Sequence, residues 1–259
     1  TGTKGIKAVE KTISKAADFT NLSKNNFFVS STGIIGIQLD VDKITNNFDR
    51  LFNNLHVKNI KDFAEAIMTT DKYYKIKKSE ISIGTKKGSI IGIAKGAGMI
   101  HPNMATMLCY LLTDIKFDTK TFKNFINRAV DSTFNCISVD GEMSTNDTVL
   151  GLSNGLLGNK KINDKSPQAN KIYKSIENIF YELSKDIVLD GEGSTKICKI
   201  IVKGTKNSMD SKRIARNIAN SLLFKTALFG SDPNWGRIIS AVGSTQIKYI
   251  DQNSIDIYI

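Results

Sequence analysis

A single threonine, Thr106, stands in the stretch KGAGMIHPNMATML at residues 95–108, between a glycine-containing loop and an apolar run. A threonine hydroxyl is a weak nucleophile that needs a base, and the chain has only two histidines, His56 and His101. Cleavage of the Ala105–Thr106 bond would give Thr106 an α-amine with a pKa of about 7.7–8.0, which can take the proton of its own hydroxyl. The same hydroxyl could make the cut by attacking the Ala105 carbonyl, forming an ester that water releases. From the residue types alone, Thr106 could instead be a threonine that begins a strand and has no catalytic role.

Other reactive patterns are absent from the sequence. GAG at 96–98 lacks the third glycine of a dinucleotide site, and GEGSTK at 191–196 has the wrong order for a phosphate-binding P-loop. No GxSxG accompanies a histidine, and no HExxH or Cys/His cluster has zinc spacing. The cysteines are three and widely spaced, which favours reduced thiols. We expect no metal site and no bound cofactor.

The chain carries 36 basic and 25 acidic residues, a net charge of +11. Such a surplus can indicate nucleic-acid binding, so a non-catalytic nucleic-acid-binding protein is one hypothesis. The lysines are scattered without a block of five or six basic residues, which favours a solvated surface and no nucleic-acid partner. No apolar run approaches the roughly 18 residues of a membrane span, and no signal peptide is visible. We expect a cytoplasmic protein with no membrane contact.

Alternating helices and strands are expected to position Thr106. Apolar residues at helical spacing predict helices over 4–18, 43–55, 60–68, 119–134, 166–187 and 210–221. β structure is predicted at 27–31, in a hairpin over 80–94 that turns at Lys-Lys-Gly, and at 107–112. Further strands are predicted over 197–203, 225–229, 238–242 and 246–250. Without βαβ regularity, an α+β or layered α/β fold fits best.

The stretch 95–108 resembles the processing site of the ornithine acetyltransferase family, the glutamate N-acetyltransferases of arginine biosynthesis. Other stretches resemble family motifs in the same order: SSTGIIG (30–36), AIMTTD (66–71), SVDGEMSTNDT (138–148), DGEGSTK (190–196), RIARNIANS (213–221) and GSDPNWGRIISAVG (230–243). These motifs are long, and together they span nearly the whole chain.

The resemblance implies a self-processing N-terminal-nucleophile enzyme with a layered α/β fold similar to the L-aminopeptidase/D-esterase-like fold. The cut would fall between Ala105 and Thr106, giving an α chain of residues 1–105 and a β chain from 106. A catalytic α/β region would cover 1–196, followed by a smaller, strand-rich and incomplete C-terminal domain over 197–259. Mature family members would be heterotetramers of two α and two β chains.

Site roles follow from the same motif matches. Thr106 would be the nucleophile, and Thr32 and Gly33 the oxyanion hole. Lys95, Glu192 and Thr69, favoured over Thr70, would bind substrate. A lysine suits a carboxylate and a glutamate suits an ammonium. Three residues of the 138–148 motif are interpreted as turn and cap residues that hold the site: Asp140, Asn146 and Asp147.

The implied reaction is a ping-pong transfer of acetyl from N2-acetyl-L-ornithine to L-glutamate through an acetyl-threonine enzyme. Some family members also accept acetyl-CoA as a co-substrate, and no sequence feature decides this point. The chain starts later than family members and ends before a segment whose Asn and Ser/Thr close over the substrate. We therefore expect a fragment, and an inactive fragment is one alternative. A self-cleaving amidase or aminopeptidase is another, although the amino-acid-binding motifs MTTD (68–71), AKG (94–96) and DGEG (190–193) argue against it.

Overall fold

The protein is described by a computed structural model that covers residues 2–101 and 107–259. Its internal contacts divide the chain into two compact units, Thr1–Thr69 and Thr70–Ile259. The expected boundary between 196 and 197 stays a prediction.

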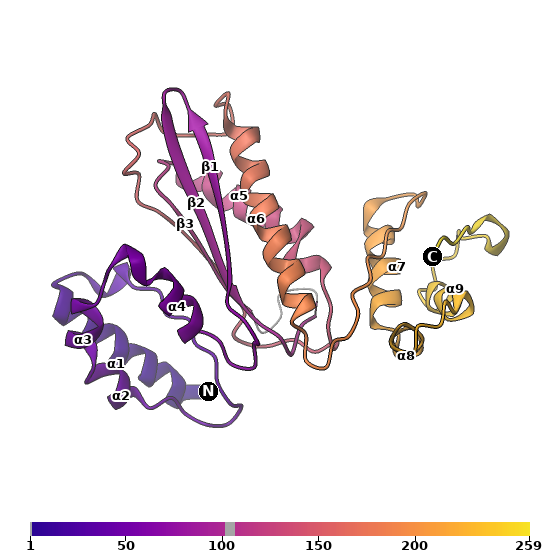
Figure 1. Cartoon of the computed structure of the whole chain (residues 1–259), viewed down its shortest axis with the longest axis horizontal. Coiled ribbons are helices and arrows are strands. Elements are labelled where there is room, and N and C mark those ends of the chain that lie inside the picture. Colours follow the sequence, from indigo (N-terminus) through magenta and orange to yellow (C-terminus); the bar gives the residue numbers. More distant parts are fainter. Residues whose placement is uncertain (1, 102–106) are drawn as a thin grey trace. The chain divides into compact units, whose positions relative to one another are not determined.

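The first unit is helical (Figure 1). Its α-helices are α1 (Gly2–Thr20), α2 (Val41–Thr45), α3 (Phe48–Asn53) and α4 (Ile60–Ala66). These helices confirm the helical prediction, although the one expected over 43–55 is interrupted at the asparagines between α2 and α3, a residue type that favours caps. The rings of Phe19 and Phe52 lie with centroids 5.2 Å apart and pack α1 on α3. Residues 27–31 form no strand, because β-prone residues need a partner strand.

The second unit is built on a four-stranded sheet in the order β1-β2-β3-β4. The strands are β1 (Lys75–Ile83), β2 (Lys86–Lys95), β3 (Leu108–Thr113) and β4 (Thr148–Ser153). The predicted hairpin is confirmed as the antiparallel pair β1–β2, and the predicted strand at 107–112 is β3. The turn lies at 84–85 and not at Lys-Lys-Gly, since Ile83 pairs with Lys86. Gly84 has a φ of 62°, which a two-residue hairpin turn requires.

Strand β4 was not expected from the sequence. It pairs in parallel with β3, so α5 (Thr119–Ser132) is the crossover of a βαβ unit. Its segment TVLGLS is short and contains a central glycine, which weakens the strand signal.

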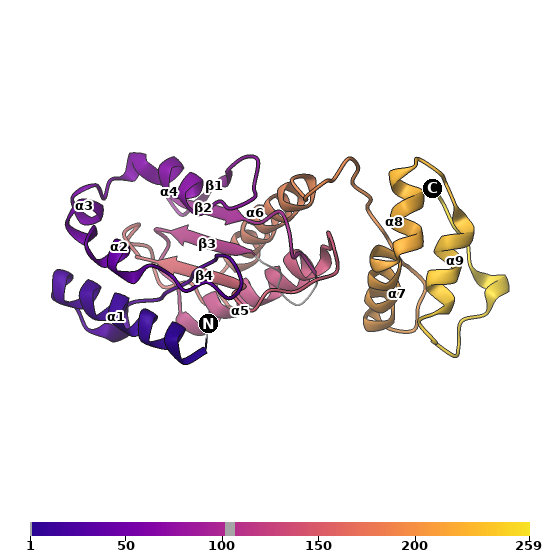
Figure 2. The same cartoon turned by 90° about the horizontal axis from the view of Figure 1, so that it is seen from below.

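Helices α5 and α6 (Ala169–Leu189) lie side by side against one face of the sheet (Figures 1 and 2). Gly92 of β2, Leu111 of β3 and Gly151 of β4 are partners in register and share this face. A Cβ at Gly92 would collide with Ile179 of α6, and one at Gly151 with Ile126 of α5. The two glycines thus let the helices approach the sheet closely.

The last part of the chain is helical, so the prediction of a strand-rich C-terminal domain is wrong. Helix α7 (Ser208–Asn220) was expected, but 225–229 lies in α8 (Leu222–Phe229) and 238–242 lies in α9 (Trp235–Gly243). Residues 197–203 and 246–250, all described, form no strand.

Side-chain caps explain this correction. Ser221 Oγ accepts a hydrogen bond from Phe224 N at 3.3 Å, and Asn234 Oδ1 accepts one from Arg237 N at 3.2 Å. Such caps start helices, and α8 is rich in the helix formers Leu, Ala and Lys. A run of about five mostly apolar residues is too short for its spacing to distinguish a strand from a buried helix. A separate apolar cluster joins α7 to α9 through Ile214, Ile218, Ala241 and Val242.

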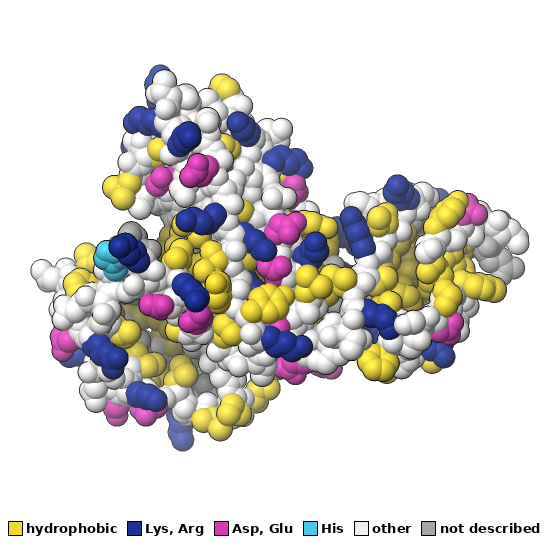
Figure 3. Space-filling view, in the orientation of Figure 1, with side chains coloured by type: hydrophobic (Ala, Val, Ile, Leu, Met, Phe, Trp, Pro, Cys, Tyr) yellow, Lys and Arg dark blue, Asp and Glu magenta, His cyan; other side chains and the backbone are white. Residues whose placement is uncertain are grey.

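No helix in the described part of the chain is long and apolar enough to cross a membrane. On the face seen in Figure 3, Lys and Arg side chains are dispersed and do not form one block.

Candidate active site

The end of β2 leads into the loop that precedes the expected nucleophile. Lys95 is the last residue of β2, pairs in register with Leu108 of β3 and is 1% exposed. Ala105 and Thr106, the expected cleavage site and nucleophile, lie outside the described residues. The two strands therefore fix the chain shortly before and shortly after this segment.

A buried ion network ties this loop to the end of α6. Lys75 Nζ contacts Asp71 Oδ1 at 2.7 Å and Asp190 Oδ2 at 2.6 Å, and all three side chains are 0% exposed. Asp71 Oδ1 also accepts a hydrogen bond from Gly96 N at 2.7 Å, and Asp190 accepts one from Lys72 N at 3.1 Å. Buried charges persist when they are paired and hydrogen-bonded. The network thus holds the first loop residue after β2 to the DGEG segment.

Glu192 lies against the same loop. Its N–H donates to Ala97 O at 2.9 Å, and a Cβ at Gly98 would come within 2.6 Å of Glu192 Oε1. The exposed Glu192 side chain also lines a pocket of about 200 Å³ that Val139 helps to form. The structure therefore brings Glu192 to the short turn that follows Lys95.

Two aspartates hold the backbone on either side of the undescribed residues. Asp140 accepts hydrogen bonds from the N–H of Met99 at 2.7 Å and of the next residue at 2.9 Å. Asp147 Oδ1 accepts one from Met107 N at 3.0 Å. Met99 has a φ of 54°, which is uncommon outside glycine, and the Asp140 bonds help to hold it there. These bonds agree with the interpretation of both aspartates as residues that hold the site.

Burial shifts the pKa of two groups at this site. It lowers the pKa of Lys95, although the charges of Asp71 and Asp147 act in the opposite direction. It raises the pKa of Asp147 from 3.8 to about 6, although the Met107 N–H and Lys95 act to lower it. Among the described residues, Asp147 Oδ2 is buried without a hydrogen-bond partner. Such shifts toward neutral pH are common at functional sites.

The remaining predicted contacts belong to the first unit. Thr32 is half-buried and Gly33 is exposed, in a segment without regular structure. Thr69 is exposed and ends the first unit, and Thr70 is exposed and begins the second. Thr32, Gly33 and Thr69 lie in the first unit, whereas the site lies in the second. Their roles stay predictions.

Sequence reasoning missed the buried network. Asp71 ends the AIMTTD motif and Asp190 begins the DGEGSTK motif, so each is close in sequence to a predicted contact. A lysine in a strand is normally a surface residue, so nothing in the sequence marks Lys75 as a buried partner of two carboxylates. Its partners lie 4 and 115 residues away along the chain, a pairing that one sequence does not reveal.

The described site offers opposite charges around one loop. A buried ammonium and an exposed carboxylate suit a ligand that carries both a carboxylate and an ammonium group. Within residues 2–101 and 107–259, no group of three or more His, Cys, Asp or Glu side chains could hold a metal ion.

The sequence is similar to curated proteins of arginine biosynthesis. A model of the ArgJ family matches residues 1–259. "Arginine biosynthesis bifunctional protein ArgJ" is 40% identical over 258 residues in Thermotoga neapolitana and 42% identical over 243 residues in Geobacter sulfurreducens. "Glutamate N-acetyltransferase" of Methanocaldococcus jannaschii is 44% identical over 230 residues. These matches cover 100%, 94% and 88% of this chain, which spans 64%, 62% and 56% of the three relatives.

A solved structure is similar as well. Arginine biosynthesis bifunctional protein argJ from Bacillus halodurans matches with a TM-score of 0.51 and 36% sequence identity. The match covers 53% of this chain and 64% of that chain. It supports the mixed α/β architecture, and the L-aminopeptidase/D-esterase-like fold stays a prediction.

Proposed function

Because the chain belongs to the ArgJ family, we propose that the protein carrying it transfers acetyl from N2-acetyl-L-ornithine to L-glutamate. The chain spans less than two thirds of its first relatives, so the proposal concerns the whole protein and not this stretch alone. The names of the relatives support this proposal: two are named arginine biosynthesis bifunctional proteins, and the one from Methanocaldococcus jannaschii is named a glutamate N-acetyltransferase.

The proposed nucleophile, Thr106, is made by self-cleavage. Its Oγ attacks the Ala105 carbonyl, the peptide nitrogen leaves with a proton, and an ester forms. Water then hydrolyses the ester, which leaves a carboxylate on Ala105 and a free α-amine on Thr106. The products are an α chain and a β chain, which we expect to assemble as two of each.

Acetyl transfer then uses the same hydroxyl. The α-amine of Thr106 takes the proton from Oγ, and Oγ attacks the acetyl carbonyl of acetyl-ornithine. The developing oxyanion would be stabilised by Thr32 and Gly33, donors that typically contribute about 2.7–4 kcal/mol each. The ornithine amine leaves with the proton. The glutamate amine next attacks the acetyl ester, and Thr106 Oγ regains its proton as N-acetylglutamate leaves.

The observation that carries this proposal is the placement of Lys95 and Glu192 around one turn just before the nucleophile segment. Lys95 would bind an α-carboxylate, and Glu192, which lines a pocket of mixed polar and apolar side chains, would bind the ammonium at the end of the ornithine side chain. Thr69, or its neighbour Thr70, would complete the substrate contacts.

Intact mass and acetyl transfer test the proposal together. The purified protein is expected to contain two fragments divided between Ala105 and Thr106 and to form N-acetylglutamate from acetyl-ornithine and glutamate. Thr106→Ala is expected to stay a single chain and to lose transfer. A wild-type chain that stays uncleaved, with the full mass of its own sequence, would contradict the nucleophile assignment.

Assays of the same purified protein distinguish the proposed transferase from two other functions. Acetate release that does not depend on glutamate would support an amidase and contradict a transferase. N-acetylglutamate formed from acetyl-CoA and glutamate would add the second donor that the word "bifunctional" in the relatives' names suggests. A nucleic-acid-binding protein would be retained on DNA in a salt-dependent way and would show neither reaction.

A further inference from the structure

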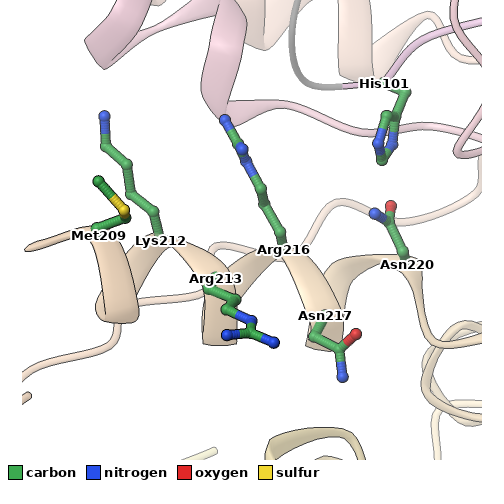
Figure 4. Close-up of a pocket in the computed structure, with 7 residues that line it drawn as sticks. All are labelled: His101, Met209, Lys212, Arg213, Arg216, Asn217 and Asn220. Carbon is green, nitrogen blue, oxygen red and sulfur yellow. The ribbon is translucent and has the colours of Figure 1, made fainter. Parts of the chain in front are cut away.

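A pocket of about 330 Å³ lies beside α7 in the second unit. Its lining residues are His101, Met209, Lys212, Arg213, Arg216, Asn217 and Asn220. Figure 4 shows Lys212 and Arg216 extending from the same side of α7, with His101 facing Asn220. Small-molecule sites begin at about this volume, so the pocket has room for a small ligand.

The cations of this pocket lack acidic partners. Lys212 Nζ donates to Asp131 O at 3.3 Å, and Arg216 Nη2 donates to Asn135 O at 3.2 Å. Both acceptors are neutral backbone carbonyls. The Asp131 carboxylate instead accepts from Asn135 Nδ2 at 2.9 Å. Among the described residues, no carboxylate forms an ion pair with Lys212, Arg213 or Arg216.

Two neutral groups add hydrogen-bonding capacity. Ser138 Oγ bonds Asn220 Oδ1 at 2.6 Å, which occupies the amide oxygen of Asn220 and leaves its NH₂ group available. His101 Nδ1 is buried without a hydrogen-bond partner among the described residues. An uncompensated buried polar nitrogen costs free energy unless a ligand or water satisfies it.

A purely structural role accounts for only part of this charge. Asp131 lies in the last turn of α5, where cations favour the negative end of the helix dipole. That end is equivalent to about half a negative charge, whereas Lys212 and Arg216, which extend from the same side of α7 (Figure 4), bring two positive charges. The surplus favours an anion.

We propose that this pocket binds a phosphate-bearing anion. Lys212 and Arg216 approach from α7, and His101 from the opposite side (Figure 4). Donors from several directions suit the tetrahedral phosphate group, whereas a planar carboxylate is best met by one arginine edge. The anion is either inorganic or the phosphate of a nucleotide. The site goes beyond acetyl transfer and does not depend on Thr106.

Calorimetric titration of the purified protein with inorganic pyrophosphate, at constant ionic strength in chloride, tests this site. We expect saturable binding that Arg216→Gln weakens by about tenfold or more, since hydrogen bonds to charged groups are strong. Lys199→Gln, an exposed charge change in the same unit, is the matched control and should leave affinity unchanged. Arg216→Lys, which keeps the positive charge, replaces Arg216→Gln in this test if the latter does not fold. We expect its affinity to lie below that of the wild type.

Competing ligands define the anion. Adenosine 3′,5′-bisphosphate that binds more tightly than pyrophosphate would identify a nucleotide phosphate, and the reverse order would identify an inorganic anion. Equal binding of citrate would overturn the phosphate assignment. The absence of saturable heat, or equal weakening by Lys199→Gln, would overturn the site itself. The same titration of Thr106→Ala should match the wild type, which separates this result from any failure of the proposed acetyl transfer.

Discussion

The carboxyl group of Asp147 occupies an unusual position for an acidic side chain. Its Oδ1 accepts the N–H of Met107, the residue that follows Thr106, while its Oδ2 is buried and has no partner in the described part of the chain. Burial raises its pKa to about 6. A carboxylate with one buried and unsatisfied oxygen destabilises a fold, so a purely structural role would be served equally well by an asparagine.

We predict that Asp147→Asn stabilises the protein at neutral pH. The pKa of Asp147 is about 6 in the folded state and about 3.9 unfolded. The folded state therefore binds this proton more tightly, and the stability that protonation gives is complete below about pH 4 and lost as the pH rises to about 6. The variant never ionises, so it should exceed the wild type by about 1–3 kcal/mol at pH 7 and match it near pH 4.

Urea unfolding at several pH values between 4 and 7 measures this difference. The Thr106→Ala background keeps the chain in one piece, and Asp164→Asn, at an exposed loop carboxylate, is the control. Acetyl transfer is assayed with Asp147→Asn in the chain that keeps Thr106, and a gain in stability together with a loss of transfer there would assign a functional role to the ionised Asp147. A difference from the wild type that does not change with pH would contradict the burial argument.

At the scale of elements, the Lys75 network joins β1, the loop after β2 and the end of α6. Lys75→Met removes the ammonium that the buried carboxylates of Asp71 and Asp190 both contact. Breaking a buried ion pair in this way typically costs about 3–5 kcal/mol. We expect urea unfolding to report a loss of this size.

Lys78→Met is the control for this prediction, since Lys78 lies on the same strand and is exposed. It should change the free energy of unfolding by less than about 0.5 kcal/mol. Equal stability of the two variants would mean that the buried network does not hold these elements together.

Several elements could be predicted from the sequence because their signals are local. The alternation of β1 and β2 and the helical spacing of α5 and α6 depend on neighbouring residues alone. Strand β4 could not be predicted, because its short segment becomes a strand by pairing with β3. Helices α8 and α9 lie where the sequence predicts strands, because the caps that begin them, Ser221 and Asn234, outweigh the short β-prone runs that follow.

In the candidate site too, some residues could be predicted from the sequence and others only from the fold. Lys95 and Glu192 stand inside long motifs, so a resemblance could point to both. The contacts that position them depend on the folded chain: the Asp71 bond to Gly96 and the approach of Glu192 to Gly98 join segments far apart in sequence. Lys75 has no motif of its own, and only the fold places it between two carboxylates.

At the scale of the whole molecule, the proposed cut falls between two strands that pair with each other. β2 precedes Ala105, β3 follows Thr106, and the two are antiparallel neighbours from Ile90–Thr113 to Lys95–Leu108. The α chain would supply β1 and β2, and the β chain would supply β3, β4 and the helices α5 and α6. One sheet and one buried core would therefore be shared by both chains.

We predict that the two chains stay associated after cleavage and separate only on denaturation. The β2–β3 ladder, the packing of Gly92 under Ile179 and the ion pair of Lys75 with Asp190 would all cross between the chains, and core burial of this kind is the main stabilising contribution to a fold. Size-exclusion chromatography should give one peak at the elution volume of uncleaved Thr106→Ala. Denaturing electrophoresis should give two bands for the wild type and one for the variant. Separate native peaks for the two fragments would contradict a shared sheet, because β2 and β3 would each lose one of their two partner strands.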